Sequence, residues 1–472
     1  MRFFNLWFLI VTLLLSPIIN VTARAQSMKD EIQELKRMIE QNQRENDELR
    51  RRIQQLESQK TTENKKVDEL YVKQQKHDAE LDSLIKLWKS LKLGFYLDTT
   101  YQGAFHQPND QDILLRSLYP NQNQFSINAF TLSLSKDPVF SDDFWDLIGF
   151  RADVLFGQQA SPLSAPGLES DVVSPYQLFI HAIAPVGNGI DFYAGRFVTL
   201  AGYEVIEARN DPNISRSILF GFAIPFTHTG IRAHYGAGPL NFYLGMNNGW
   251  DTVKNDDGNF TLESQVSLGT EDITPWLNAA SIALTGYFGK ESQTDDPTTY
   301  DDWRNLLTVV GSVTLMDRLT LVADADFGWQ QGITSTDLSL NDQQAFWWGV
   351  AGYAIVDLYK DVVNFNLRGE YFNDRDRFRT FANDSTATKF FEITPTIAVR
   401  PFKGLAIGGK YLDNLEVRGE FRWDRANEPY FLRKDGQLNQ NQYELSAQLL
   451  YWFDTGEFEP EKPVESAPEL EE

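Results

Sequence analysis

The sequence predicts an all-β transmembrane barrel of about 16 antiparallel strands, preceded by a long α-helical coiled coil. Three observations lead to this fold class. Segments in which apolar and polar residues alternate recur between residues 92 and 453, and the connections between them alternate between short turns and long polar loops. A charged, helix-forming segment precedes these strands, and an apolar export signal begins the chain.

Residues 1–25 have the pattern of a cleaved signal peptide. A charged start at Arg2 is followed by a mostly apolar stretch, 3–19, and by a small-x-small cleavage site at Ala23 and Ala25. A retained signal anchor is the alternative. After residue 25 no apolar stretch approaches the roughly 18–20 residues that a spanning helix needs. Beyond the signal, the chain can therefore cross a membrane only as a closed barrel, which satisfies its own backbone hydrogen bonds in lipid.

The composition disfavours several classes of function. The formal charge is -23, with 66 acidic and 43 basic residues, and phosphate binding by contrast requires clustered Lys and Arg, so nucleic acid is not an expected partner. The chain has no Cys, which excludes disulfides and thiolate metal sites. No metal-ligand spacing, Ser/His/acid set, P-loop or nucleophile elbow is present. The sequence thus predicts no enzyme, no metal site and no cofactor.

Residues 26–91 are predicted to form a periplasmic coiled-coil stem. Segment 28–90 contains no Pro or Gly, and one heptad frame places apolar residues from Ile32 to Trp88 at its a and d positions. At ~1.5 Å per residue, such a stem is roughly 80–90 Å long. Polar residues such as Asn42 and His77 occupy some core positions, where they would set register and oligomer number. A single solvated helix is the alternative.

Residues 92–453 are predicted to form the barrel. Alternation is clearest in the last segment, where Leu445 and Leu449 fall on one face and Glu444 and Gln448 on the other. The number of such segments is even, as a single-chain bacterial barrel requires. The candidate strands begin near Leu93, Asn128, Leu147, Tyr176, Ile190, Thr227, Leu240, Leu262, Ala279, Leu306, Leu319, Trp348, Val362, Phe391, Leu415 and Tyr443.

Connection lengths distinguish the two ends of the barrel. Segregation of short turns and long loops is typical of outer-membrane barrels, whereas a soluble sandwich has no reason for it. The fourteenth strand could extend from Phe391 to Tyr411, and the facing of the fifth is ambiguous around Gly195. Short turns are predicted at 185–189, 236–239, 316–318 and 412–414, and long loops at 106–124, 157–175, 198–226, 251–260, 290–302, 330–345, 373–387 and 425–440.

Several strands carry charges on the face opposite their apolar face. In segment 319–327, Leu321 and Phe327 fall on one face, and Asp324 and Asp326 on the other. Because buried unpaired charges are very costly, the charged face is predicted to be wet. Cross-strand pairing that only stabilises the wall is the alternative role for any one residue. The predicted lumen-lining residues are Arg151, Asp153, Arg232, Asp324, Asp326, Arg368, Glu370, Arg418, Glu420 and Arg422.

The third long loop contains an apolar run, 218–226, that must pack on the barrel wall or on a neighbouring subunit. If the loop packs inside the barrel, its charges lie where the lumen is narrowest, and a ring of fixed charges selects solutes by sign. Ordinary loop charges exposed to water are the alternative. The candidate constriction residues are Glu204, Glu207, Arg209, Asp211 and Arg216.

Two stretches around this loop, AGRFVTLAGYEVIEA at 194–208 and NISRSILFGFAIPFTHTG at 213–230, resemble the OmpL-like β-barrel porin family. Shorter stretches at 247–251 and 419–424 are similar to it as well. The resemblance covers residues 92–453 and implies a barrel in the outer membrane of a Gram-negative-type bacterium. It also implies a third loop folded into the lumen, as in general porins. A stem before the barrel resembles the layout of trimeric sugar porins, which favours a homotrimer.

The acidic segment 454–472 is predicted to be a disordered tail in the periplasm, on the same side as the stem. The predicted function is an outer-membrane porin that passes small hydrophilic solutes or ions by passive diffusion. An outer-membrane anchor with a periplasmic stem and a plugged barrel is the alternative. The expected partners are outer-membrane lipid, other copies of the chain and peptidoglycan. The sequence does not identify the solute.

Overall fold

The computed structural model describes residues 73–78, 81, 85–105, 107–108, 112–255, 258–293, 298–335, 338, 340–380, 385–405 and 411–455. The chain divides into two units, Met1–Lys89 and Ser90–Glu472. In the first unit, segments 73–78 and 85–89 are helical, while the predicted signal peptide and most of the predicted stem lie outside the described residues. So does the tail from residue 456 onward. No helix within the described part is both long and apolar enough to cross a membrane.

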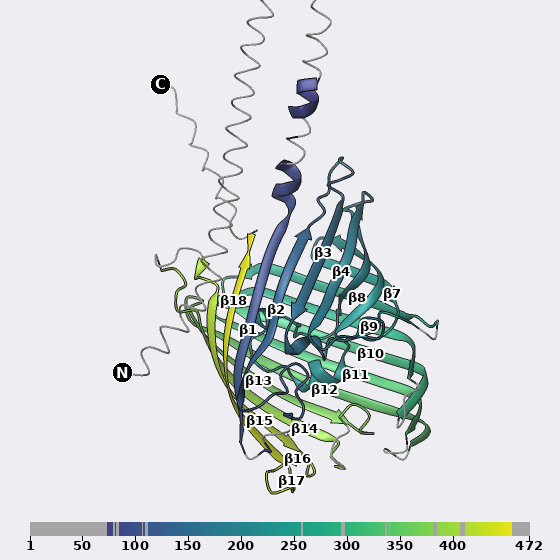
Figure 1. The fold of residues 1–472 in the computed structure, drawn as a ribbon, viewed down its shortest axis with the longest axis vertical. Coiled ribbons are helices and arrows are strands. Elements are labelled where there is room, and N and C mark those ends of the chain that lie inside the picture. Colours follow the sequence, from purple (N-terminus) through teal and green to yellow (C-terminus); the bar gives the residue numbers. More distant parts are fainter. Residues whose placement is uncertain are drawn as a thin grey trace, which may run out of the picture. The chain divides into compact units, whose positions relative to one another are not determined.

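The second unit is a closed barrel of 16 antiparallel strands, in which each strand pairs with its neighbours in sequence and β1 pairs with β18 (Figure 1). The closing register joins Gly94 to Asp454 and Phe105 to Tyr443. The strands are β1 (Lys92–Phe105), β2 (Gln124–Lys136), β3 (Ile148–Phe156), β4 (Val173–Ala184), β5 (Ile190–Val198), β6 (Thr227–Ala237), β7 (Leu240–Asn247), β8 (Thr261–Thr274), β9 (Leu277–Gln293), β10 (Thr298–Leu315), β11 (Leu319–Ser335), β12 (Leu340–Tyr359), β13 (Val363–Asp374), β14 (Lys389–Val399), β15 (Leu415–Ala426) and β18 (Asn441–Asp454).

This architecture confirms the predicted barrel and its strand number, but some predicted loops are wrong in extent. Strands β9 to β12 are longer than predicted, so the segments 290–302 and 330–345 are largely strand rather than loop. The cross-strand pairing of Thr298 with Ser335 shows that polar residues continue the ladder there. Within 425–440, β16 (Phe431–Leu432) and β17 (Leu438–Asn439) form a separate small hairpin. Sequence alternation located the apolar part of each strand and missed these polar extensions.

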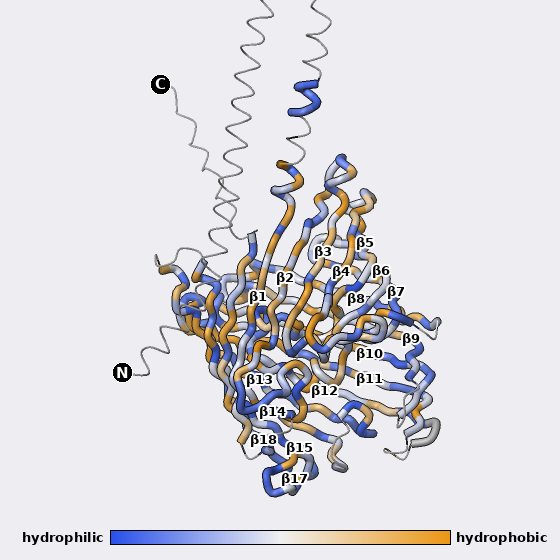
Figure 2. The backbone as a smooth tube through the Cα atoms, in the orientation of Figure 1, coloured by the Kyte–Doolittle hydropathy of each residue, from blue (hydrophilic) through white to orange (hydrophobic). Residues whose placement is uncertain are grey.

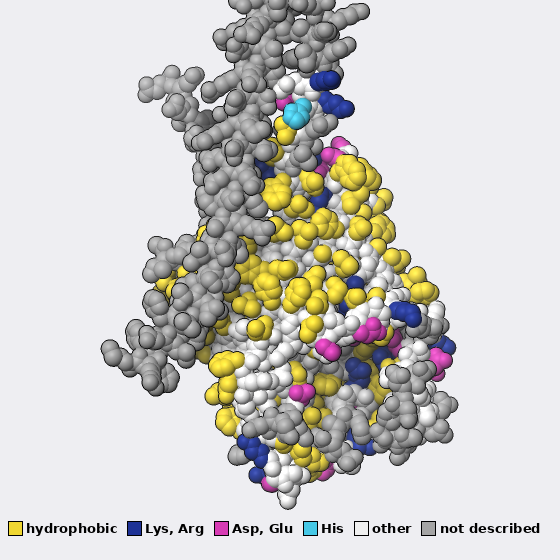
Figure 3. Space-filling model, in the orientation of Figure 1, with side chains coloured by type: hydrophobic (Ala, Val, Ile, Leu, Met, Phe, Trp, Pro, Cys, Tyr) yellow, Lys and Arg dark blue, Asp and Glu magenta, His cyan; other side chains and the backbone are white. Residues whose placement is uncertain are grey.

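The outer face of the barrel is apolar. Leu321 and Leu367 are each 39% exposed and Leu445 is 56% exposed, whereas Asp324 and Arg368 on the opposite face are buried. Hydrophobic and hydrophilic residues alternate along the strands (Figure 2), and hydrophobic side chains gather on the outer surface of β1 to β4 (Figure 3). This facing is the one that the alternation predicts for a barrel wall in lipid.

Candidate functional site in the barrel interior

The third loop (residues 199–226) connects β5 to β6 and carries the main candidate site. Its two ends meet, because the Thr199 N–H donates to the Phe226 carbonyl oxygen at 3.0 Å. It contains the short helices η2 (Ala208–Asn210) and η3 (Leu219–Ala223). Its apolar side chains are buried in one cluster with inward-facing aromatic residues of β12 to β14. The buried apolar residues of the loop are Ala201, Ile206, Ala208, Ile214, Ile218, Leu219, Phe220, Ala223 and Ile224.

Two glycines in the wall leave room for this packing. A Cβ atom on Gly349 of β12 would lie 2.7 Å from Cδ1 of Leu219, which is closer than side chains tolerate. A Cβ atom on Gly328 of β11 would lie 2.2 Å from the indole of Trp347. That indole in turn donates from Nε1 to the carbonyl oxygen of Ala223 at 3.1 Å. The wall is therefore shaped to receive helix η3.

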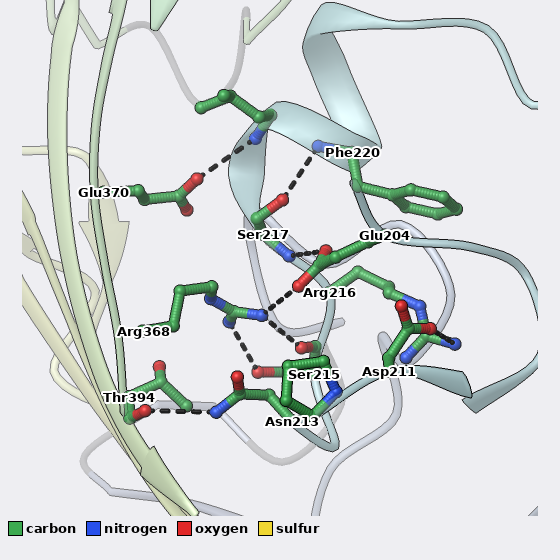
Figure 4. Close-up of polar contacts among 12 residues, drawn as sticks. Glu204, Asp211, Asn213, Ser215, Arg216, Ser217, Phe220, Arg368, Glu370 and Thr394 are labelled. Carbon is green, nitrogen blue, oxygen red and sulfur yellow. Dashed lines mark hydrogen bonds and ion pairs between the residues drawn. The ribbon is translucent and has the colours of Figure 1, made fainter. Parts of the chain in front are cut away.

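Wall carboxylates accept hydrogen bonds from the backbone of the third loop. Glu370 of β13 accepts from the N–H of Ile218 at 2.6 Å, as Figure 4 shows, and Glu420 of β15 accepts from the N–H of Ile214 at 2.6 Å. Asp324 of β11 accepts from a backbone N–H near the start of the loop at 3.0 Å. An ionised acceptor makes roughly twice as strong a hydrogen bond as a neutral one. The loop is thus held along its length by three strands.

Arg368 of β13 is the most fully used of the wall cations. It is completely buried, and its Nη1 donates to Oε1 of Glu204 at 2.7 Å and to the carbonyl oxygen of Ser215 at 2.6 Å (Figure 4). Its Nε donates to Oε2 of Glu392 on β14 at 3.0 Å. The guanidinium therefore joins two strands of the wall to both halves of the third loop, and no donor face is left for solvent.

Two arginines of β15 also bind the third loop through its carbonyl oxygens. Nη1 of Arg418 donates to the carbonyl oxygen of Ala208 at 3.0 Å, and Nη1 of Arg422 donates to that of Arg216 at 2.6 Å. Backbone carbonyls that are buried away from water require such partners. The alternating charges of β15 thus match alternating N–H and C=O groups of the loop.

The five predicted constriction charges do not all face open space. Glu204 accepts from a backbone N–H inside the loop at 2.7 Å, and Arg216 pairs with Asp211 at 2.9 Å, all three being buried. Glu207 pairs with Arg209 at 2.6 Å. Burial opposes the charge of Arg209, but the adjacent Glu207 carboxylate more than offsets this and holds the pKa of the guanidinium above its ordinary value. Arg209 is the most exposed of the five.

A polar cavity of about 330 Å³ lies between the third loop and the strand ends next to the short turns. Charged side chains of both signs line it, including Arg209 and Asp211 from the loop. The wall contributes three arginines and four carboxylates, namely Arg318, Arg400, Arg418, Asp317, Asp357, Asp361 and Glu416. In this cavity two of the predicted constriction residues, Arg209 and Asp211, meet one predicted lumen-lining residue, Arg418.

The described part of the first loop, 107–108 and 112–123, also packs against the wall, a contact that the sequence does not predict. Its Arg116 is buried and pairs with Asp424 at 2.6 Å and with Glu444. The Tyr119 hydroxyl donates to Asp98 of β1 at 2.6 Å. Strand alternation places Glu444 on the inner face, and the same alternation in β15 could have placed Asp424 there. Nothing in the sequence around Arg116 distinguishes it from an exposed loop arginine.

The prediction that the charged face is wet is wrong for much of this wall. Arg368 and Asp326 are 0% exposed, and no predicted lumen residue on β11, β13 or β15 exceeds 6%. The physical reason is that the first and third loops cover these side chains and supply opposite charges and backbone partners in place of water. Asp326 is an exception, since neither of its carboxylate oxygens has a hydrogen-bond partner in the described structure.

The remaining predicted wall charges form cross-strand or same-strand pairs away from the third loop's apolar run. Arg151 pairs with Asp153 on β3 at 2.6 Å, and Arg232 of β6 pairs with Glu263 of β8. Such pairs stabilise the wall and leave little net charge at those points. Within the described residues, no group of three or more His, Asp or Glu side chains is arranged to hold a metal ion.

Comparison with known proteins identifies the family. The family model described as "Putative beta-barrel porin-2, OmpL-like" matches residues 90–453. No curated protein sequence matches the chain. Similar solved structures include the outer membrane channel DcaP of Acinetobacter baumannii, at 14% identity and TM-score 0.47, covering 77% of this chain and 97% of that one. An anion-selective porin from Comamonas acidovorans is similar at 11% identity and TM-score 0.48, covering 77% and 99%. On the family match, the chain belongs to the OmpL-like β-barrel porins.

Proposed function

We propose that the protein is an outer-membrane porin through which small hydrophilic solutes or ions diffuse passively, in a lumen narrowed by the third loop. Membership of the porin family supports a porin-type channel in a Gram-negative outer membrane. The observation that carries the proposal is the hydrogen bonding of the third loop to inward-facing charges of β11, β13 and β15. A loop held in this way is expected to restrict the cross-section of the lumen.

The proposed filter is the charged cavity beside the third loop, with Arg209 and Asp211 as its loop residues and Arg400 and Glu416 among its wall residues. Charges that face a narrow aqueous passage select by sign. We assign Glu204, Glu207 and Arg216 an indirect part, because their contacts hold Arg209 and Asp211 in place.

Arg209→Gln is expected to shift ion selectivity towards cations. The substitution removes the most exposed positive charge of the third loop and leaves the wall carboxylates in place. The cation-to-anion permeability ratio is expected to rise by about two-fold or more, which the reversal potential in a salt gradient measures. The matched control is Arg433→Gln, a 44%-exposed side chain in the β16–β17 hairpin. Equal reversal potentials in both variants would contradict the assigned filter.

A second candidate function is an outer-membrane anchor whose barrel is plugged. The observation that favours it is the burial of the wall charges under the first and third loops, since a plug needs such contacts. The two functions differ in one measurable property, because a plugged barrel carries no steady ion current. Single-channel conductance of the refolded protein therefore separates them.

We further propose that the chain assembles as a homotrimer through the stem and the barrel, with the stem and the tail in the periplasm near peptidoglycan. The heptad frame from Ile32 to Trp88 supports the stem, which lies mainly outside the described residues. A peptide of residues 26–90 is expected to be helical and trimeric at high micromolar concentration. Sedimentation equilibrium with circular dichroism measures both properties. A monomeric peptide would remove the stem as an assembly element.

A further inference from the structure

Two arginines converge on one indole at the end of the barrel that carries the long loops. Cζ of Arg304, on β10, lies 5.1 Å from the ring centre of Trp250, and Cζ of Arg379, in the loop after β13, lies 5.5 Å from it. Arg304 also lies over Tyr300 at 4.7 Å and over Phe378 at 5.7 Å. Arg304 is 5% exposed, and Arg379 is half-buried. Two like charges therefore lie against one cluster of aromatic side chains.

Neither arginine lies within ion-pairing distance of a carboxylate in the described structure, although Glu291 acts electrostatically on Arg304 and Asp374 and Asp251 act on Arg379. The salt bridges of the described residues include none to Arg304 or Arg379, although three carboxylates lie nearby. Asp374 accepts hydrogen bonds from the backbone of 378–380, Glu291 accepts from the N–H of Trp250, and Asp251 accepts from backbone N–H groups of 226–227. These acceptors are engaged by backbone donors. Cation–π contacts are weak and do not neutralise charge.

Two buried donors of this cluster have no hydrogen-bond acceptor in the described structure. Nη2 of Arg304 and Nε1 of Trp250 are buried and have no hydrogen-bond partner, and Arg304 uses only its Nε, towards Gln330 at 2.8 Å. Arg379 uses its Nε towards the carbonyl oxygen of Phe222, on helix η3, at 2.6 Å. Burial and, second, the charge of Arg304 lower the pKa of Arg379 to about 10. An unpaired buried donor is destabilising, so a ligand that accepts hydrogen bonds from it gains affinity here.

We propose that Arg304, Arg379 and Trp250 form a binding site for an oxyanion, meaning the carboxylate, sulfate or phosphate group of a small solute. Planar guanidinium groups bind such groups through paired N–H donors, and two guanidinium charges beside unpaired donors favour an anion over a cation. Because Arg379 and Trp347 also bond to helix η3, the site adjoins the third loop. The inference rests on the proposed function only for the route by which the anion arrives.

Isothermal titration of the refolded full chain with sulfate tests the site. The titration is done in neutral detergent and Tris chloride at constant ionic strength, and the wild type is expected to show saturable binding. Arg304→Gln and Arg379→Gln each remove a charged donor and are expected to weaken sulfate binding about ten-fold or more. Trp250→Phe keeps an aromatic ring and removes one neutral donor, the indole N–H, so about a two- to ten-fold loss of sulfate affinity is expected. Folding of each variant is checked by heat-modifiable gel mobility.

The matched control is Arg375→Gln, four residues from Arg379 in the same loop, 62% exposed and paired with Asp376. It is expected to bind sulfate like the wild type. Absence of saturable binding in the wild type, or equal binding in all folded variants, would overturn the site. If the arginine variants do not fold, unchanged binding in Trp250→Phe overturns it instead. Single-channel conductance of the same preparations separates the proposals, because a conducting protein without sulfate binding contradicts this site alone.

Discussion

Leu367→Arg is expected to prevent most of the protein molecules from folding into a bilayer. Leu367 lies near the middle of β13 on the outer face, 39% exposed between the outward residues Phe365 and Gly369. An arginine at the midplane of a barrel's lipid face costs roughly 2–4 kcal/mol. That cost is a large fraction of the free energy that stabilises an ordinary domain, about 5–15 kcal/mol. Refolding yield in liposomes, and the urea midpoint of any folded fraction, measure the effect.

The control for this prediction is Thr320→Arg on β11. Thr320 lines the polar cavity of about 330 Å³, where a charged side chain stays in contact with water and with carboxylates such as Asp357. This variant is therefore expected to fold with a yield close to that of the wild type. If both arginine variants lose folding to the same extent, the assignment of the lipid and lumen faces is incorrect.

Arg368→Met is expected to release the third loop while the barrel stays folded. The substitution keeps the apolar stem, leaves Glu204 buried without its cation, and leaves Glu392 with only Arg422 at 3.9 Å. Removing one partner from a buried ion pair costs about 3–5 kcal/mol, which exceeds the contribution of any single remaining hydrogen bond of the loop. The cost falls mainly on the loop, because the backbone ladder of β13 does not depend on this side chain. Planar-bilayer recording is expected to show a larger and noisier single-channel conductance.

The comparison variant for this experiment is Arg375→Gln, which removes an exposed arginine in the loop that follows the same strand. Exposed ion pairs contribute about 0–1 kcal/mol, so its conductance is expected to match that of the wild type. An unchanged conductance in a correctly folded Arg368→Met protein would show that Arg368 does not hold the third loop across the lumen.

Much of the barrel could be predicted because its signal is local. Side chains alternate with a period of two along each strand, so Leu321 and Asp324 reveal their faces without knowledge of their neighbours. The predicted starts at Ile190, Thr227 and Leu240 coincide with the observed first residues of β5, β6 and β7. The polar ends of β10 and β12 were missed, because strand above the membrane has no lipid to impose an apolar face.

The interior could be predicted only in part, because its contacts join residues far apart in the sequence. The alternation of side chains along β13 places Arg368 on the inner face. It does not reveal that Glu204 and Ser215 of the third loop cover Arg368. Charged residues on the inner face predict a surface in contact with water. Charged residues that pair with a loop produce the same alternation in the sequence, so the two cases cannot be distinguished from it. Likewise, Arg304 and Arg379 meet Trp250 only once the long loops are placed. These contacts could not be predicted because the residues that make them lie far apart in the sequence.

Single-channel conductance tests most directly whether the barrel conducts ions and whether the third loop narrows its lumen. The chain without its predicted signal peptide, 26–472, is refolded and recorded beside a variant in which 201–224 is replaced by a short Gly-Ser linker between ends that already meet at Thr199 and Phe226. Discrete, ohmic conductance steps are expected for the wild type, with larger steps for the variant. A silent wild type beside a conducting variant, or equal steps in both, would contradict the proposed function.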